Sequence, residues 1–288
     1  MPAFVVILGY FSKTQSAAKI GGLFLQYLIF QTLYTGFSLL FLRQGKPPVS
    51  FLTPYWLLWF LVSAMLWKII TPLLARLSFV PVFVFLVALS VFAGFDKTVS
   101  YYLSISRTLV FFPFYYLGYR AQNRHFLLFK KIPRWAAVFV FFCFFALLFS
   151  TNFVSRRFLY GAQPYSALRL GGWQPAVWRL AELSAGFILL CCFFALVPWG
   201  QTRYTALGRR TMQAFLLHGF VLRYLQYGTP LQSLLHAPLA KAVFLAALLP
   251  LTLLLLSAPV GRLFSPLFYP LRFAAGIKRH FLPERSAR

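Results

Sequence analysis

Two ionisable side chains inside long apolar runs are the residues of this chain best suited to chemistry. Arg107 lies in SYYLSISRTLVFFPFYYLGY, flanked by Ser106 and Thr108, and His218 lies in TMQAFLLHGFVLRYL. An ionisable group costs free energy in an apolar layer unless it has a polar partner or lines a wet cavity. A guanidinium can hold carbonyl or hydroxyl oxygens, and an imidazole can take up or relay a proton. A hydrogen bond between packed helices is the open alternative for both residues.

Other charged residues in apolar surroundings have simpler explanations. Glu182 follows Arg179 by three residues, so on a helix the two side chains share a face and can form an ion pair. We therefore interpret Glu182 as structural rather than catalytic. Lys68 stands near the end of its apolar run and can extend its ammonium group to the water interface. Asp96 and Lys97 lie in a predicted turn, where we expect them to face water.

The sequence lacks the motifs of soluble enzymes. It contains no GxSxG, P-loop, HExxH or GxGxxG pattern. With 3 acidic residues in the chain, catalysis by paired carboxylates is nearly excluded. Cys143, Cys191 and Cys192 lie inside apolar runs without metal-ligand or disulfide spacing, so no metal site is predicted.

The composition predicts an integral membrane protein. Hydrophobic residues make up 60% of the 288, and 11% are charged, whereas a soluble domain carries about 25% charged residues. We therefore expect an all-α fold, a polytopic transmembrane helix bundle. Residues 1–262 are predicted to form one transmembrane domain, and residues 263–288 a basic cytoplasmic tail.

Eight apolar runs approach the roughly 20 residues that a membrane-spanning helix needs. These predicted spans are Gly22–Leu42, Pro54–Pro72, Phe79–Phe95, Tyr101–Tyr119, Trp135–Ser150, Leu180–Pro198, Thr211–Gly228 and Ala242–Ala258. Met1–Phe11 is apolar but too short to span, and is predicted to form a partial helix.

The distribution of basic residues predicts the orientation of these spans. The chain has 28 Lys and Arg residues, and they lie mainly in short loops, where membrane proteins place them to fix topology. With Arg120–Arg134, Gln201–Arg210 and the C-terminal tail inside, seventeen are cytoplasmic and eight external. Anionic lipid headgroups are a second reason for this charge, and nucleic-acid binding is not predicted.

This topology places the N-terminus on the external side of the membrane. Met1 would begin outside and the partial helix would run inward, whereas most chains begin in the cytoplasm. We therefore expect a longer gene product, with half of one helix and all of another preceding Met1. A signal peptide is not predicted, because no basic segment precedes the apolar stretch.

The segment Asn152–Trp178 is the longest predicted external connection. It contains Tyr160, Gln163, Tyr165 and Trp173 among several arginines. Aromatic and amide side chains together are typical of a sugar-binding surface. They are also typical of the aromatic belt at a membrane interface, and this is the interpretation that we favour on the residues alone.

Four stretches resemble the membrane O-acyltransferases of acyltransferase family 3, and most of all the fucose 4-O-acetylase branch. MPAFVVILGYFSK is similar to the second helix of that family, and PYWLLWFLVSAMLWKIITPLL to its Trp-rich helix. LSISRTLVFFPFYYLGY resembles the helix with Ser-Arg, Phe-Pro-Phe and Leu-Gly-Tyr, and LGRRTMQAFLLHGF the late helix with Arg-Thr and Leu-His. The four occur in the family's order, from Met1 to about Phe220.

The resemblance implies an enzyme of ten helices with both termini inside. It implies transfer of an acetyl group from cytoplasmic acetyl-CoA, with no bound cofactor, to a hydroxyl of a sugar or envelope polysaccharide. The expected partners are the acyl donor, the glycan acceptor and membrane lipids, in a bacterial inner (plasma) membrane. One departure matters: the family's first-helix Arg and catalytic His have no counterpart here, so the chain as written is expected to be inactive.

The resemblance also suggests site residues. Arg107 matches the Ser-Arg motif and is predicted to hold acyl or acceptor oxygens, while His218 matches Leu-His and is predicted to relay a proton or orient a partner. These two are the predicted catalytic residues. The predicted substrate-binding residues are Ser106, Tyr116, Tyr160, Tyr165 and Trp59.

A transporter or flippase of a glycan or lipid-linked substrate is the alternative function. Transporter folds often carry internal repeats with broken helices in corresponding positions. The two halves of this chain show no such similarity, which disfavours the alternative. A non-catalytic membrane partner protein is the third possibility.

Overall fold

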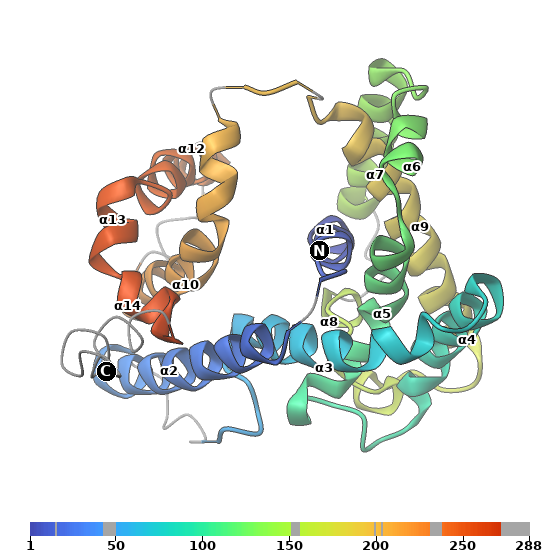
Figure 1. Ribbon diagram of the computed structural model, residues 1–288, viewed down its shortest axis with the longest axis horizontal. Coiled ribbons are helices and arrows are strands. Elements are labelled where there is room, and N and C mark those ends of the chain that lie inside the picture. The colour runs from blue at the N-terminus through green and yellow to red at the C-terminus, as the bar shows by residue number, and fades with distance from the viewer. Residues whose placement is uncertain are drawn as a thin grey trace, which may run out of the picture. The chain divides into compact units, whose positions relative to one another are not determined.

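The described part of the chain folds entirely into helices. The computed structural model describes residues 1–14, 16–42, 50–150, 156–198, 200–202, 204–230 and 238–271, and no strand occurs among them (Figure 1). The α-helices are α1 (Pro2–Tyr10), α2 (Ala17–Phe41), α3 (Trp59–Leu74), α4 (Phe79–Phe92), α5 (Ile105–Arg120), α6 (Asn123–Phe129), α7 (Arg134–Ser150), α8 (Arg156–Leu159), α9 (Gln174–Leu196), α10 (Thr211–Tyr227), α12 (Pro238–Leu255), α13 (Ala258–Leu263) and α14 (Ser265–Phe268). Short 3-10 helices are η1 (Trp56–Leu58), η2 (Ala93–Phe95), η3 (Tyr102–Ser104), η4 (Tyr165–Leu168) and η5 (Thr205–Arg210). The predicted all-α fold is therefore confirmed for the described residues.

Three helices in the described part are long and apolar enough to cross a membrane. They are Ala17–Phe41, Trp56–Leu74 and Gln174–Leu196. Phe79–Phe95, Arg134–Leu147 and Ala242–Leu255 are apolar but shorter. Each of the eight predicted spans overlaps a helix. The five predicted spans that are not among the three candidates correspond to helices that are shorter or more polar. The helices α5 and α10 have 16 and 17 residues and carry Arg107, His218 and Arg223.

The chain forms two compact units. The first unit comprises Met1–Ser16 and Val62–Gly200, and the second comprises Ala17–Leu61 and Gln201–Arg288. Each is described by itself below.

The first unit is built on close packing of α1 against α5, with α4 and α9 also packed on this pair (Figure 1). Two glycines permit the contact. A Cβ atom on Gly9 would collide with the backbone carbonyl of Tyr115, and one on Gly118 with the carbonyl of Val6. Small residues at membrane helix interfaces let backbones approach in this way. Elsewhere in this unit, α7 packs on α9 through Ala137, Cys192 and Ala195.

We predict that Gly118→Ala destabilises the protein by about 1–3 kcal/mol, because the added methyl group forces two helix backbones apart. Gly21→Ala is the matched control. Gly21 lies in α2 with open space at its Cβ position, so the same change there should be neutral or stabilising. Thermal unfolding in detergent, followed by size-exclusion chromatography, measures both. Equal melting temperatures for the two variants would contradict the α1–α5 contact.

The second unit joins α2 to α10 through a buried tyrosine. Tyr34 Oη donates to the carbonyl of Leu216 at 2.7 Å, and its ring stacks on Phe220 at 3.9 Å between centroids. Gly219 leaves the space that the Tyr34 hydroxyl occupies. Gln213 on α10 donates to the carbonyls of Leu255 at 2.8 Å and Ser257 at 3.1 Å, which ties α10 to the turn between α12 and α13.

The predicted tail begins with packed structure. The helix α14 lies within residues 263–288 and packs on α2. Its Phe268 is buried, stacks on Phe30 and accepts a hydrogen bond from Gln26 through its carbonyl. The rest of the predicted tail, residues 272–288, lies outside the described residues.

Candidate functional site

Arg107 and its neighbours form one polar group at the start of α5. The chain enters α5 through two left-handed residues, Leu103 and Ser104, with φ of 46° and 53°. The guanidinium of Arg107 lies 5.7 Å from the centre of the Tyr101 ring, and Tyr160 is a second electrostatic neighbour. Ser106 Oγ donates to the carbonyl of Gly161 at 2.8 Å, which holds the residue after Tyr160 on α5. The structure thus brings together three predicted site residues, Arg107, Ser106 and Tyr160.

The hydroxyl of Thr108, the residue after Arg107, stabilises the start of α5. Thr108 Oγ1 donates to the carbonyl of Ser104 at 2.9 Å and lies 2.7 Å from Ser63 Oγ. Trp67 Nε1 donates to the carbonyl of Thr108 at 2.9 Å. Buried polar groups need such partners, so Thr108, like Ser106, fixes the unusual backbone from which Arg107 projects.

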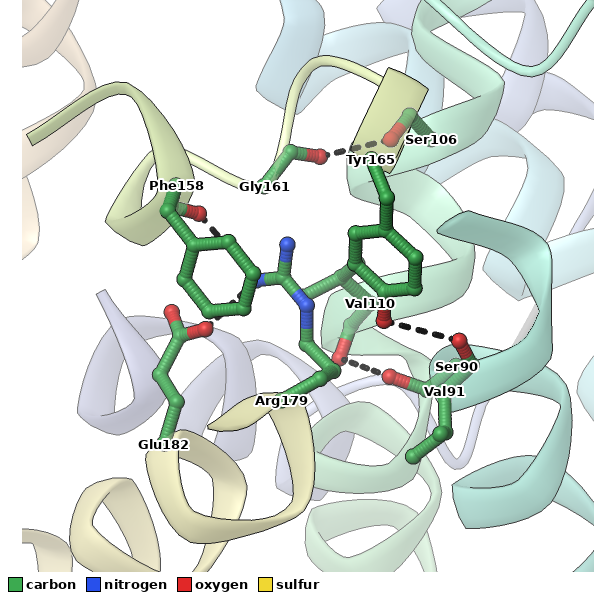
Figure 2. A network of polar contacts seen from close by, with 9 residues as sticks. All are labelled: Ser90, Val91, Ser106, Val110, Phe158, Gly161, Tyr165, Arg179 and Glu182. Carbon is green, nitrogen blue, oxygen red and sulfur yellow. Dashed lines mark hydrogen bonds and ion pairs between the residues drawn. The ribbon is translucent and has the colours of Figure 1, made fainter. Parts of the chain in front are cut away.

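A buried ion pair lies in α9 of the first unit (Figure 2). Arg179 is 2% exposed, and its Nη1 donates to Glu182 Oε2 at 2.5 Å and to the carbonyl of Phe158 at 3.2 Å. The guanidinium also stacks 4.2 Å from the centre of the Phe158 ring. The predicted pairing of Arg179 with Glu182 is confirmed. Because the pair has these partners on its own helix and on the segment before it, we interpret it as structural.

Three predicted substrate-binding residues lie in the core. The ring of Tyr165 packs on Gly94. Its hydroxyl donates to the carbonyl of Val91 at 2.8 Å (Figure 2), and burial raises the pKa of this hydroxyl above its usual range. Tyr116 is fully buried and stacks on Phe79 at 5.7 Å. Trp59, in the second unit, is also buried. All three stabilise the fold in this conformation, and their contact with a substrate stays a prediction.

His218, on α10 of the second unit, has a defined tautomer. Its Nδ1 lies 2.9 Å from the carbonyl oxygen of Ala214. A carbonyl oxygen only accepts, so Nδ1 carries the proton and Nε2 of the neutral ring keeps its lone pair. The half-buried ring lies 6.1 Å from Trp56 and 6.2 Å from Phe215 between centroids. This geometry suits Nε2 to accept a proton.

Arg223 is a residue of this site that the sequence analysis did not select. Its guanidinium lies 5.2 Å from the Tyr55 ring, 5.3 Å from Trp56 and 4.8 Å from Tyr227. Trp56 therefore contacts both Arg223 and His218. Arg223 stands five residues after His218 in the same apolar run, and that intramembrane charge is the signal that could have found it.

The segment before η1 is held in place by α2. Gln31 accepts a hydrogen bond from the backbone N–H of Tyr55 at 2.8 Å and donates to the carbonyls of Ser50 at 2.8 Å and Thr53 at 3.2 Å. Trp56 has a φ of 33°, a conformation that costs free energy in a bulky residue and is often retained at functional sites. The indole between His218 and Arg223 is thus held by a specific backbone conformation.

Two hollows in the described surface lie away from these residues. One, of about 250 Å³, is lined by Gln31, Thr32, Thr35, Gly36, Leu39, Ser50 and Phe51. The other, of about 290 Å³, is lined by apolar side chains of α7 and α9. Neither includes Arg107, His218 or Arg223.

Fold and composition together define the class: an α-helical membrane protein with three candidate spans among its described residues. No family model, curated protein sequence or solved structure matches the chain.

Proposed function

We propose that this protein is a membrane O-acyltransferase that moves an acetyl group from cytoplasmic acetyl-CoA to a hydroxyl of a sugar or envelope polysaccharide. The observation that carries the proposal is the geometry of His218, whose Nδ1 bonds to Ala214 and whose Nε2 is left as a base. The four stretches that resemble acyltransferase family 3 support it. Acyl transfer to an alcohol needs such a base, and positive donors for the oxyanion that develops. Because the first-helix His of that family has no counterpart in this sequence, we propose that His218 supplies the base here and that the chain is active as written, contrary to what the resemblance implies.

In the proposed reaction His218 Nε2 accepts the proton of the acceptor hydroxyl as its oxygen attacks the thioester carbonyl carbon. The tetrahedral oxyanion then collapses, the carbon–sulfur bond breaks, and the CoA thiolate leaves with the electron pair. The thiolate takes the proton from His218, and the imidazole returns to its neutral form. Arg107, which belongs to the first unit, stays a predicted residue for holding acyl or acceptor oxygens through its guanidinium.

Deletion of the gene in its host cell tests the proposal. Loss of O-acetyl groups from the envelope glycan, measured by mass spectrometry and restored by the gene in trans, is the expected result. An unchanged glycan would contradict the transferase. A glycan that is absent from the outer surface, with its precursor accumulating inside, would instead favour the transporter or flippase.

We further propose eight spans in a bacterial inner membrane, with the C-terminus and the Arg120–Arg134 and Gln201–Arg210 loops in the cytoplasm. Single cysteines in a background without Cys143, Cys191 and Cys192 test this topology. Gln122 and Ser166 are both exposed. An impermeant maleimide should label Ser166→Cys on intact spheroplasts, and Gln122→Cys only after permeabilisation. Labelling of both positions from outside would rule the topology out.

A further inference from the structure

Arg223, Tyr55, Trp56 and Tyr227 form a group that we call the Arg223 cluster. Three aromatic rings lie within 5.3 Å of one guanidinium. Aromatic faces attract a cation, but they are poor acceptors for the five N–H donors of arginine. Arg223 Nε is buried, and no hydrogen-bond acceptor for it occurs in the described part of the chain.

The protein has few carboxylates to offer as a counterion. Its sequence contains 3 acidic residues. Asp96 accepts hydrogen bonds from the backbone N–H and the hydroxyl of Thr98, both at 2.8 Å, and the backbone bond holds its pKa below the usual range. Glu182 is paired with Arg179, and Glu284 lies outside the described residues. Arg223, a permanently charged side chain in apolar surroundings, therefore has no carboxylate as a counterion among the described residues.

We propose that the Arg223 cluster binds a negatively charged group, a carboxylate or a phosphate, carried by the sugar acceptor. This inference rests on the proposed transferase function and names its substrate class as an anionic glycan. A guanidinium matches the two oxygens of either group in a bidentate pair. The surrounding rings supply flat apolar faces for the C–H surface of a sugar, and Trp56 is 39% exposed.

The position of Trp56 connects this subsite to the proposed base. The indole contacts the guanidinium of Arg223 and lies 6.1 Å from the ring of His218. A sugar stacked on Trp56 with its anionic group at Arg223 would hold a hydroxyl on the His218 side. A lipid phosphate could also neutralise Arg223, but it would not explain why the Trp56 indole lies next to both Arg223 and His218. We therefore favour the sugar.

Binding of a matched pair of oligosaccharides tests the proposal. The protein is purified into phosphatidylcholine nanodiscs and titrated with tetragalacturonate and with the neutral methyl ester of the same oligomer. We expect the anionic oligomer to bind about tenfold more tightly. Arg223→Gln should abolish this preference, and Arg223→Lys should keep part of it as a single point charge. The control is Arg209→Gln, which removes the same charge at an exposed position and should bind as the wild type does.

The outcomes separate the ligand sources. Arg223-dependent binding of glucose 1-phosphate in place of tetragalacturonate would support the proposal and identify phosphate as the group. Equal binding of both oligomers, or a preference kept by Arg223→Gln, would overturn it. The proposal would also be overturned if the cluster bound a lipid instead of a sugar. In that case neither anionic sugar would bind, and Arg223→Gln would lose only co-purifying phosphatidylglycerol. The titrations contain no acyl donor, so they succeed or fail independently of acetyl transfer in cells.

Discussion

Replacing His218 by alanine is expected to lower acetylation of the host glycan by about a hundred- to ten-thousand-fold, the usual contribution of a general base. The expectation follows from one contact. Because Nδ1 lies 2.9 Å from the Ala214 carbonyl, the ring presents Nε2 as its basic nitrogen. Removing the imidazole removes the proposed proton acceptor. The acetyl content of the glycan, measured by mass in a deletion strain complemented with each variant, gives the effect.

A second substitution separates a base from a structural residue. In His218→Asn the side-chain amide can still donate to the Ala214 carbonyl, but it has no basic nitrogen. We expect this variant to insert at the wild-type level and to be as inactive as His218→Ala. His125→Asn is the control, since His125 is exposed and accepts a hydrogen bond from the Gln122 backbone at 3.0 Å. Activity retained in His218→Asn would show that His218 acts through packing alone.

The helices and one ion pair were predictable because both depend on local sequence. Apolar runs need internal hydrogen bonds in a membrane, and a helix satisfies them within one segment. Arg179 and Glu182 stand three residues apart, which places them on one helix face whatever the rest of the chain does. The structure contains that pair at 2.5 Å.

The contacts between segments were not predictable. Gly9 packs on the backbone of Tyr115, and Gly118 packs on that of Val6, because α1 packs on α5. The residues around each glycine do not indicate which helix it will contact. The Arg223 cluster likewise joins the end of α10 to residues just before and within η1. From the sequence, the members of the cluster are recognisable only separately, as an isolated intramembrane charge and as part of a Trp-rich segment.

Residue type alone also failed to separate core from site. Tyr160 and Tyr165 both belong to the predicted external segment, yet Tyr160 is 64% exposed and Tyr165 is 2% exposed. Tyrosine serves either role, because it combines a large apolar ring with a hydroxyl that needs one partner. The backbone carbonyl of Val91 supplies that partner for Tyr165, and such a carbonyl is invisible to a pattern of side chains.

The buried ion pair of α9 leads to the second large expected effect. Glu182→Ala leaves the charge of Arg179, which is 2% exposed, without its carboxylate. Breaking a buried pair in this way typically costs about 3–5 kcal/mol. The carbonyl of Phe158 and the Phe158 ring still contact the guanidinium, but neither neutralises it. We therefore expect a large loss of folded protein and a lowered midpoint of thermal unfolding in detergent.

Replacing both partners should be milder than replacing one. In the double variant Arg179→Met with Glu182→Leu, no charge stays buried, and apolar side chains of similar length fill the space beside Phe158. Such replacements are often neutral, so the double variant should unfold closer to the wild type than Glu182→Ala does. Asp96→Asn, which removes one negative charge as Glu182→Ala does but at an exposed position, controls for net charge and should unfold close to the wild type. If the double variant were less stable than Glu182→Ala, the pair would contribute packing and hydrogen bonds beyond mutual neutralisation, and its role as a charge-balancing structural pair would be wrong.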